Sequence, residues 1–123
     1  MAKLANIYSY KVLDKTLSVS LSTLLVGLQN LLATQFIRPG YTVINMSMTM
    51  PYSLTLNDAL ANYYAAGAVV VVAAGNGGVD ACTQSPASAG SSVFTIGASS
   101  YDDSMASFSN YGTCLDIFAP GIF

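Results

Sequence analysis

The sequence has 123 residues and a formal net charge of −2, with four basic and six acidic residues. Charged residues make up only 8% of it, against about 25% in an average soluble domain, whereas 53% are hydrophobic. This composition predicts a single partial domain over residues 1–123, part of a larger soluble protein. The four basic residues are scattered and form no patch for nucleic acid: Lys3, Lys11, Lys15 and Arg38.

The first third of the chain predicts a strand, a helix and a second strand. Apolar residues alternate loosely over residues 6–13, which predicts the first strand. Leucines then recur at helical spacing from Leu21 to Leu32, which predicts an amphipathic helix ending near Gln35. Polar residues interrupt this apolar stretch, so we expect no membrane span, and no leader of the basic-then-apolar kind is visible. The second strand is expected at residues 43–48.

The remaining elements complete an alternation of strands and helices. A second helix is predicted over residues 56–66, with Thr55 as its N-cap and Gly67 at its end. Further strands are expected at residues 68–74, 93–98 and 115–118. Strand-helix-strand-helix-strand order is typical of an α/β fold with a parallel sheet and flanking helices.

The segment VVVVAAGNG, residues 69–77, is the most informative in the chain. Four valines and two alanines predict a strand buried on both faces, and Asn76 follows at its carboxyl end, where α/β sheets bind their ligands. Three interpretations remain open from the residues alone. Asn76 is a turn residue, or part of a dinucleotide-binding glycine loop, or a hydrogen-bond donor to a reacting oxygen. Asp80 occupies the place of the third glycine, which disfavours the nucleotide loop.

Several motifs occur in an order that resembles the central part of subtilisin-like serine proteases of the proteinase K and aqualysin branch. They are residues 73–76 (AAGN), 85–88 (SPAS), 95–99 (TIGAS), 107–112 (SFSNYG) and 115–121 (LDIFAPG). Upstream, residues 2–5 (AKLA), 11–14 (KVLD) and 43–48 (VINMSM) also resemble that branch. The resemblance implies a partial subtilisin-like three-layer fold.

The same resemblance implies roles for the residues around Asn76. Asn76 itself would donate to the oxyanion of the tetrahedral intermediate. One wall of the pocket for the residue before the scissile bond would consist of Ala73, Ala74 and Gly75. The opposite wall would consist of Ser47, Met48 and Thr49. Thr49 and Met50 stand where this family usually has glycine, so their side chains are expected near the edge where a substrate backbone pairs.

Cys82 and Cys114 lie in loop-like sequence and, on the residues alone, are either free buried thiols or a pair. The resemblance implies that they form a disulfide, and hence an oxidising, extracellular compartment. It also implies a possible structural calcium ion at Asp116, with backbone carbonyls near Gly90 and Val93. No cofactor is expected to be required for the chemistry.

The chain has no histidine, so it contains no Ser-His-Asp triad. The family motifs that carry the triad are expected outside residues 1–123. We therefore expect part of a serine endopeptidase that acts on polypeptides, inactive alone, with no nucleic-acid or membrane partner. The alternative is a non-catalytic, protease-like module that binds a peptide or a partner protease.

Overall fold

A computed structural model of the protein describes residues 3–34 and 37–122. Its centre is a sheet of four parallel strands in the order β1-β3-β5-β6. The strands are β1 (Val43–Met46), β3 (Val69–Ala73), β5 (Phe94–Ser99) and β6 (Ile117–Pro120). Beside it, β2 (Met50–Pro51) and β4 (Gln84–Ser85) form a short antiparallel pair. The predicted α/β fold class is confirmed.

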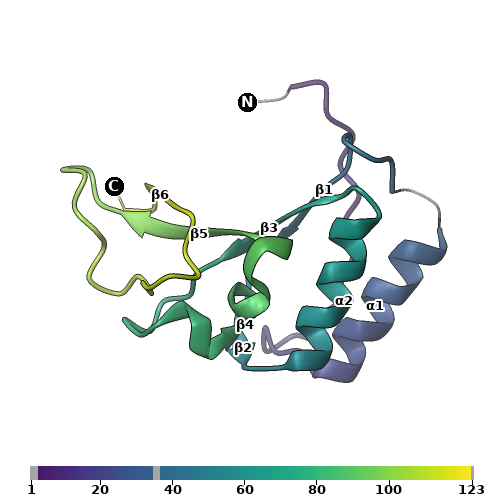
Figure 1. Ribbon diagram of the computed structural model, residues 1–123, viewed down its shortest axis with the longest axis horizontal. Coiled ribbons are helices and arrows are strands. Elements are labelled where there is room, and N and C mark those ends of the chain that lie inside the picture. Colours follow the sequence, from purple (N-terminus) through teal and green to yellow (C-terminus); the bar gives the residue numbers. More distant parts are fainter. Residues whose placement is uncertain (1–2, 35–36, 123) are drawn as a thin grey trace.

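Two α-helices, α1 (Leu21–Ala33) and α2 (Leu54–Ala65), lie side by side on one face of this sheet (Figure 1). Two short 3-10 helices, η1 (Ala81–Thr83) and η2 (Ala87–Ser92), connect β3 to β5. The β5–β6 end of the sheet projects beyond the α-helices. None of the described helices is long and apolar enough to cross a membrane.

Helix α2 connects β1 to β3, and its two ends are fixed locally. Ser53 is the N-cap, and its hydroxyl accepts a hydrogen bond from the backbone N–H of Leu56 at 3.3 Å. At the other end Gly67 has φ +85°, and a Cβ there would lie 2.7 Å from Cβ of Pro39. Glycine therefore ends the helix and lets the chain turn directly into β3.

The main core fills the space between the helices and the sheet. Its largest fully buried side chains are Leu56, Leu60, Tyr63, Val70 and Val72. The Tyr63 hydroxyl donates to the backbone carbonyl of Leu28, which joins α2 to α1. Burial raises the pKa of Tyr63 to about 12, because the apolar surroundings disfavour the phenolate.

The opposite face of the sheet is also apolar, but no described helix covers it. Val69, Phe94 and Ile117 are 47%, 50% and 51% exposed on this face, whereas Val70 and Val72 on the helix side are nearly inaccessible. Strands with apolar residues on both faces are typical of sheets covered on both sides. The described residues thus form two layers of the predicted three.

Most predicted elements are found with shifted ends, and one is absent. Residues 6–13 form no strand. The strand β1 is the edge of the sheet, and a cavity of about 930 Å³ lies between it and residues 4–12. Because of this gap, residues 6–13 have no neighbouring strand with which to form backbone hydrogen bonds. Helix α2 begins two residues earlier than predicted, with Ser53 in place of Thr55 as N-cap. The predicted helix end at Gln35 lies outside the described residues.

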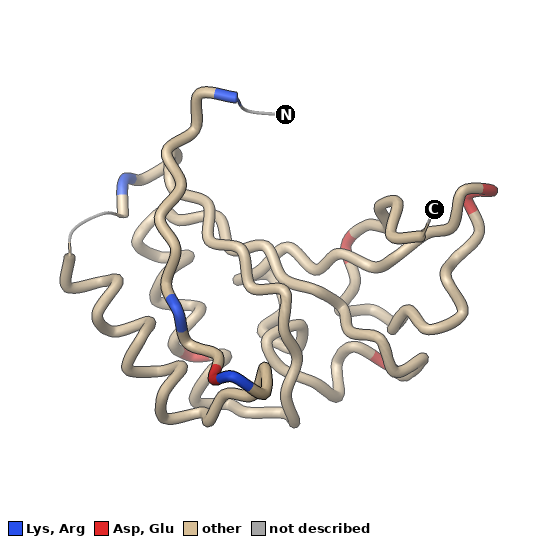
Figure 2. Tube along the Cα trace, turned by 180° about the vertical axis from the view of Figure 1, so that it is seen from behind, with Lys and Arg blue, Asp and Glu red and all other residues tan. Residues whose placement is uncertain are grey.

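Charges divide the molecule into two parts (Figure 2). All four basic residues precede β1, on the side of the molecule that carries the α-helices. Four of the six aspartates follow β3: Asp80, Asp102, Asp103 and Asp116. All charged side chains at the β5–β6 end are therefore negative.

Candidate active site

A cavity of about 440 Å³ opens at the carboxyl end of β3. Four of the predicted site residues line it: Ser47, Ala73, Gly75 and Asn76. Its other side is formed by the ends of β5 and β6 and by Phe108. The cavity also includes Val71, Ile96 and Ala98, so it lies over the uncovered face of the sheet and reaches the carboxyl ends of β3 and β6, the edge where α/β proteins bind their ligands.

Asn76 is exposed at the rim of this cavity, in the loop that follows β3. Its amide has no hydrogen-bond partner among the described residues, so both N–H groups are available to a ligand. The following residues up to Val79 are also exposed. The loop of residues 75–79, here called the Asn76 loop, thus presents one free amide on the end of a rigid strand.

Gly75 begins this loop in a conformation that other residues rarely adopt. Its φ is +108°, and a Cβ there would lie 2.4 Å from Nδ2 of Asn110 and 3.1 Å from Cγ2 of Thr49. Both the positive φ and the close neighbours require glycine. Thr49 is thereby placed next to Gly75, although it does not line the cavity itself.

Three predicted or suspected pocket residues lie elsewhere. The side chain of Ala74 is buried with Ala81 and Ala87 on the side of the sheet away from the cavity. Met48 and Met50 pack against the main core, and Met50 also pairs with Ser85 in the β2–β4 ribbon. The alternating directions of strand side chains explain why Ala73 lines the cavity but Ala74 does not.

Asn110 is the residue that sequence reasoning missed. It is fully buried, and its side chain hydrogen-bonds on both sides of Asn76, to Ala74 and to Gly77. In the sequence, Asn110 is marked only as the carboxamide of the SFSNYG motif, residues 107–112.

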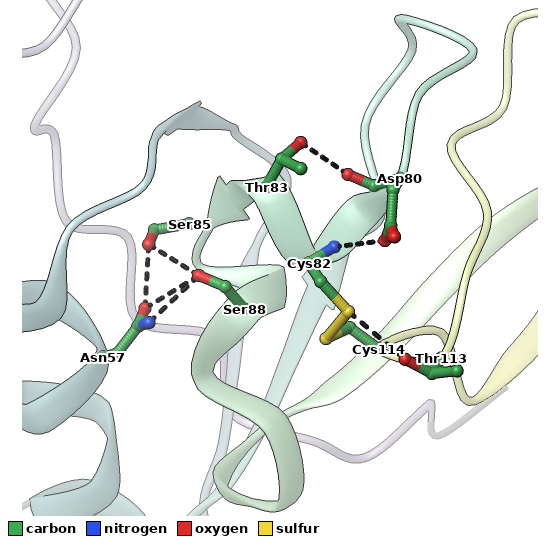
Figure 3. Close-up of a disulfide and its surroundings, with 8 residues drawn as sticks. All are labelled: Asn57, Asp80, Cys82, Thr83, Ser85, Ser88, Thr113 and Cys114. Carbon is green, nitrogen blue, oxygen red and sulfur yellow. Dashed lines mark hydrogen bonds between the residues drawn. A yellow bond between two sulfur atoms is a disulfide. The ribbon is translucent and has the colours of Figure 1, made fainter.

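Cys82 and Cys114 form a disulfide that joins η1 to the loop before β6, as the family resemblance implied (Figure 3). Their Cα atoms are 5.3 Å apart, and 32 positions separate them in the sequence. Asp80 caps η1 by accepting from the Cys82 backbone N–H at 2.9 Å. The turn that carries Cys82 is therefore held both covalently and by a side-chain cap.

Asp116 lies directly before β6 and is exposed. One of its carboxylate oxygens accepts from the Thr95 backbone N–H at 2.7 Å, which leaves the other oxygen open to solvent. The Gly90 carbonyl already accepts from the Val93 N–H at 3.1 Å. No three metal-binding side chains cluster among the described residues. The site fits a hard cation only through one carboxylate, backbone carbonyls and water.

Comparison with known proteins identifies the class. The subtilase (peptidase S8) family matches residues 1–122, and the chain belongs to that family of serine proteases. Within it, the similar sequences place the chain in the proteinase K branch.

Proteinase R from Parengyodontium album is 43% identical over 124 residues, which cover 98% of this chain and 32% of that protein. Extracellular serine proteinase from a Thermus species is 44% identical over 121 residues, covering 98% and 28%. The crystal structure of a cold-adapted subtilisin-like serine proteinase matches 90% of this chain and 39% of its own, with a TM-score of 0.81 and 37% identity. The chain thus spans about a third of the length of the curated relatives it matches.

Proposed function

We propose that this chain forms the oxyanion-binding and pocket-forming part of a subtilisin-like serine endopeptidase. The observation that carries the proposal is the free, exposed amide of Asn76 at the rim of the cavity that follows β3. An uncharged carboxamide suits this role because it donates without titrating, and a rigid strand end orients it in advance.

In the proposed reaction a serine hydroxyl attacks the carbonyl carbon of the scissile peptide bond. The carbonyl oxygen becomes an oxyanion, to which Nδ2–H of Asn76 donates. Collapse of this intermediate expels the amine and leaves an acyl-enzyme, which water then hydrolyses to the carboxylic acid. The serine, its histidine base and the orienting aspartate come from outside these 123 residues, which contain no histidine. The chain alone is therefore proposed to be inactive.

The proposed substrate is a polypeptide. Ala73 and Gly75 are small and line the cavity, which leaves room beside them for a side chain before the scissile bond. Ser47, which follows β1, also lines this cavity. The disulfide between Cys82 and Cys114 supports a secreted protein, because such bonds persist in oxidising compartments. No nucleic-acid or membrane partner is part of the proposal.

A structural calcium ion at Asp116 is a separate part of the proposal, and the chemistry itself requires no cofactor. The open carboxylate oxygen of Asp116 and backbone carbonyls near Gly90 and Val93 would hold the ion. It would stabilise the loops before β5 and β6 and take no part in peptide hydrolysis.

The test is a chimera in which residues 1–123 replace the matching segment of proteinase R, which would supply the triad. Asn76→Ala is expected to lower kcat by about 10²–10³ with little change in KM, the loss known for removing one oxyanion donor from a subtilisin. Asn76→Asp is expected to be at least as damaging, because a carboxylate would face the oxyanion. Asn62→Ala, an exposed asparagine on α2, is the control and should leave both constants unchanged.

An unchanged kcat in the Asn76→Ala chimera would make Asn76 a turn residue. A chimera that folds and binds peptide without turnover would favour the non-catalytic module instead. Hydrolysis by the purified 123-residue chain that falls with Asn76→Ala would contradict the proposed inactivity of the isolated chain.

A further inference from the structure

We propose that Asn110 is a positioning residue that sets the geometry of the Asn76 amide. This inference rests on the proposed role of Asn76 as oxyanion donor. It concerns a residue that is remote in sequence and that does not line the cavity.

The Asn110 carboxamide is fully buried and uses both ends to hold the Asn76 loop. Its Nδ2 donates to the Ala74 carbonyl at 2.8 Å and to Oε1 of Gln84 at 3.1 Å. Its Oδ1 accepts from the backbone N–H groups of Gly77 at 2.9 Å and Val79 at 3.1 Å. A carboxamide offers two donor hydrogens and two acceptor lone pairs, so all four are satisfied. The contacts fall on both sides of residue 76.

Backbone hydrogen bonds add to this hold. The segment of residues 108–111 runs along the loop of residues 75–79 and exchanges main-chain bonds with it. These are Asn110 N–H to Gly75 O at 3.0 Å, Gly78 N–H to Phe108 O at 2.9 Å and Tyr111 N–H to Val79 O at 3.1 Å. Asn110 thus lies at the centre of a group of hydrogen bonds. These bonds hold the exposed Asn76 loop, which has little apolar packing of its own.

The segment that carries Asn110 is itself fixed to the sheet. The neighbouring Ser109 is 1% exposed, and its hydroxyl accepts from the Ala98 backbone N–H at 3.0 Å. Ala98 lies in β5, which pairs with β3. The Asn76 loop is therefore held from two directions, by its own strand β3 and, through Asn110, by β5.

The residue at position 110 must be asparagine for this arrangement. Aspartate keeps the acceptor for Gly77 and Val79 but loses the donor, and its carboxylate would face the Ala74 carbonyl. Alanine removes all four side-chain bonds and leaves the carbonyl of the buried Ala74 without its partner. Gly75 is matched to it, because a Cβ there would lie 2.4 Å from Nδ2 of Asn110.

Loss of this hold should reduce the rate and spare substrate binding. The oxyanion exists only in the transition state, so a displaced Asn76 amide weakens stabilisation of that state alone. A displacement on the order of 1 Å costs up to about a hundredfold in rate. For a displacement of the Asn76 amide by about 1 Å, we expect Asn110→Ala to lower kcat by roughly tenfold to a hundredfold. We expect KM to change by less than about threefold.

The experiment is a double-mutant cycle in the proteinase R chimera, with kcat normalised to active sites counted by an irreversible serine-directed inhibitor. The variants are Asn76→Ala, Asn110→Ala and both together. If Asn110 acts through Asn76, adding Asn110→Ala to Asn76→Ala lowers kcat by less than about threefold further, because residues that act as one unit are not additive. Asn110→Asp should give an intermediate kcat, since it keeps half of the side-chain bonds.

Asn57→Ala is the matched control for a structural role. Asn57 is also a buried asparagine, and its carboxamide bonds to Ser85 and Ser88 instead of the Asn76 loop. It should lower the melting temperature as Asn110→Ala does, without lowering kcat well below that temperature. If Asn110→Ala yields no titratable sites, Asn110→Asp and Asn110→Ser decide the question in the same cycle.

The outcomes separate the two proposals. An unchanged kcat on Asn76→Ala overturns the proposed function. A large loss on Asn76→Ala with no loss on Asn110→Ala or Asn110→Asp overturns the positioning role alone. Multiplicative losses in the double variant, or an equal kcat loss on Asn57→Ala, also overturn it, because each would mean that Asn110 acts on the fold and not through Asn76.

Discussion

The helical half of the molecule and the half that carries the candidate site are held together differently. In the helical half, large side chains such as Leu56, Leu60 and Val72 fill the space between α1, α2 and the sheet. In the site half the buried apolar cluster consists of three alanines: Ala74, Ala81 and Ala87. There the buried polar groups include the Asn110 carboxamide and the Ser109 hydroxyl, and a disulfide joins η1 to the loop before β6.

The difference matters because the two kinds of interaction constrain geometry differently. Apolar burial is non-directional, and cores tolerate substitutions that keep volume. Hydrogen bonds have preferred distances and angles, so a network such as Asn57–Ser85–Ser88, or the four bonds of Asn110, specifies positions more closely. A site that must hold one amide in place benefits from the second kind.

The largest expected effect on stability belongs to the helical half. Leu60→Ala removes a side chain that is completely buried and leaves a cavity, so we expect a loss of about 2–5 kcal/mol in the free energy of unfolding. Leu54→Ala is the matched control on the same helix, because Leu54 is 61% exposed and should cost less than about 0.5 kcal/mol. Urea unfolding measures both. Equal losses for the two variants would contradict the conclusion that buried side chains of α2 stabilise this half.

The disulfide should contribute a similar amount to stability, and its effect should be local to the site half. Closing a loop of 32 residues stabilises by about 3–4 kcal/mol in the chain-entropy account. Reduction should therefore increase hydrogen exchange between Cys82 and Cys114 more than in α1 and α2. The control is the Cys82→Ala/Cys114→Ala variant, which reductant should not affect. Two thiols that alkylate freely in folded, unreduced protein would refute the bond.

The sequence predicted correctly those helices and strands that have a clear hydrophobic periodicity of their own. The valine run gave β3, and the leucine spacing gave α1, because periodicity reflects burial directly. Residues 6–13 have the alternation of a strand but no neighbour to pair with, and a ladder needs two partners. The two-residue strands β2 and β4 are too short for any pattern to reveal.

The family motifs name candidate site residues, and the structure shows which of them share a cavity. Ser47, Ala73, Gly75 and Asn76 do line one cavity, which follows from their places at strand ends. The side chains of Met48 and Ala74 point elsewhere, because the strand alternation decides which neighbour faces the cavity. Asn110 lies 34 positions after Asn76, and only the fold brings its carboxamide to the loop.

The smallest expected effect is the proposed calcium ion at Asp116, which would add one more directional contact to the site half. Its surroundings favour a cation, because all charged side chains at the β5–β6 end are acidic (Figure 2). The donor set is thin, with one carboxylate that already accepts from Thr95, so we expect weak binding with a dissociation constant of about 1 mM. At about 10 mM calcium this would stabilise the folded chain by roughly 1.4 kcal/mol.

Thermal unfolding with and without calcium at constant ionic strength measures this effect. The expected rise in melting temperature should vanish in Asp116→Asn, which keeps an acceptor for the Thr95 N–H but loses the charge. Asp102→Asn is the matched control, since Asp102 is an exposed carboxylate of the same half that bonds to Ser104 instead. A rise that survives Asp116→Asn but is lost with Asp102→Asn would move the ion to Asp102, in the turn that follows β5. No rise in any variant would mean that Asp116 acts only as a cap for β5, and that the site half is held by its hydrogen bonds and disulfide alone.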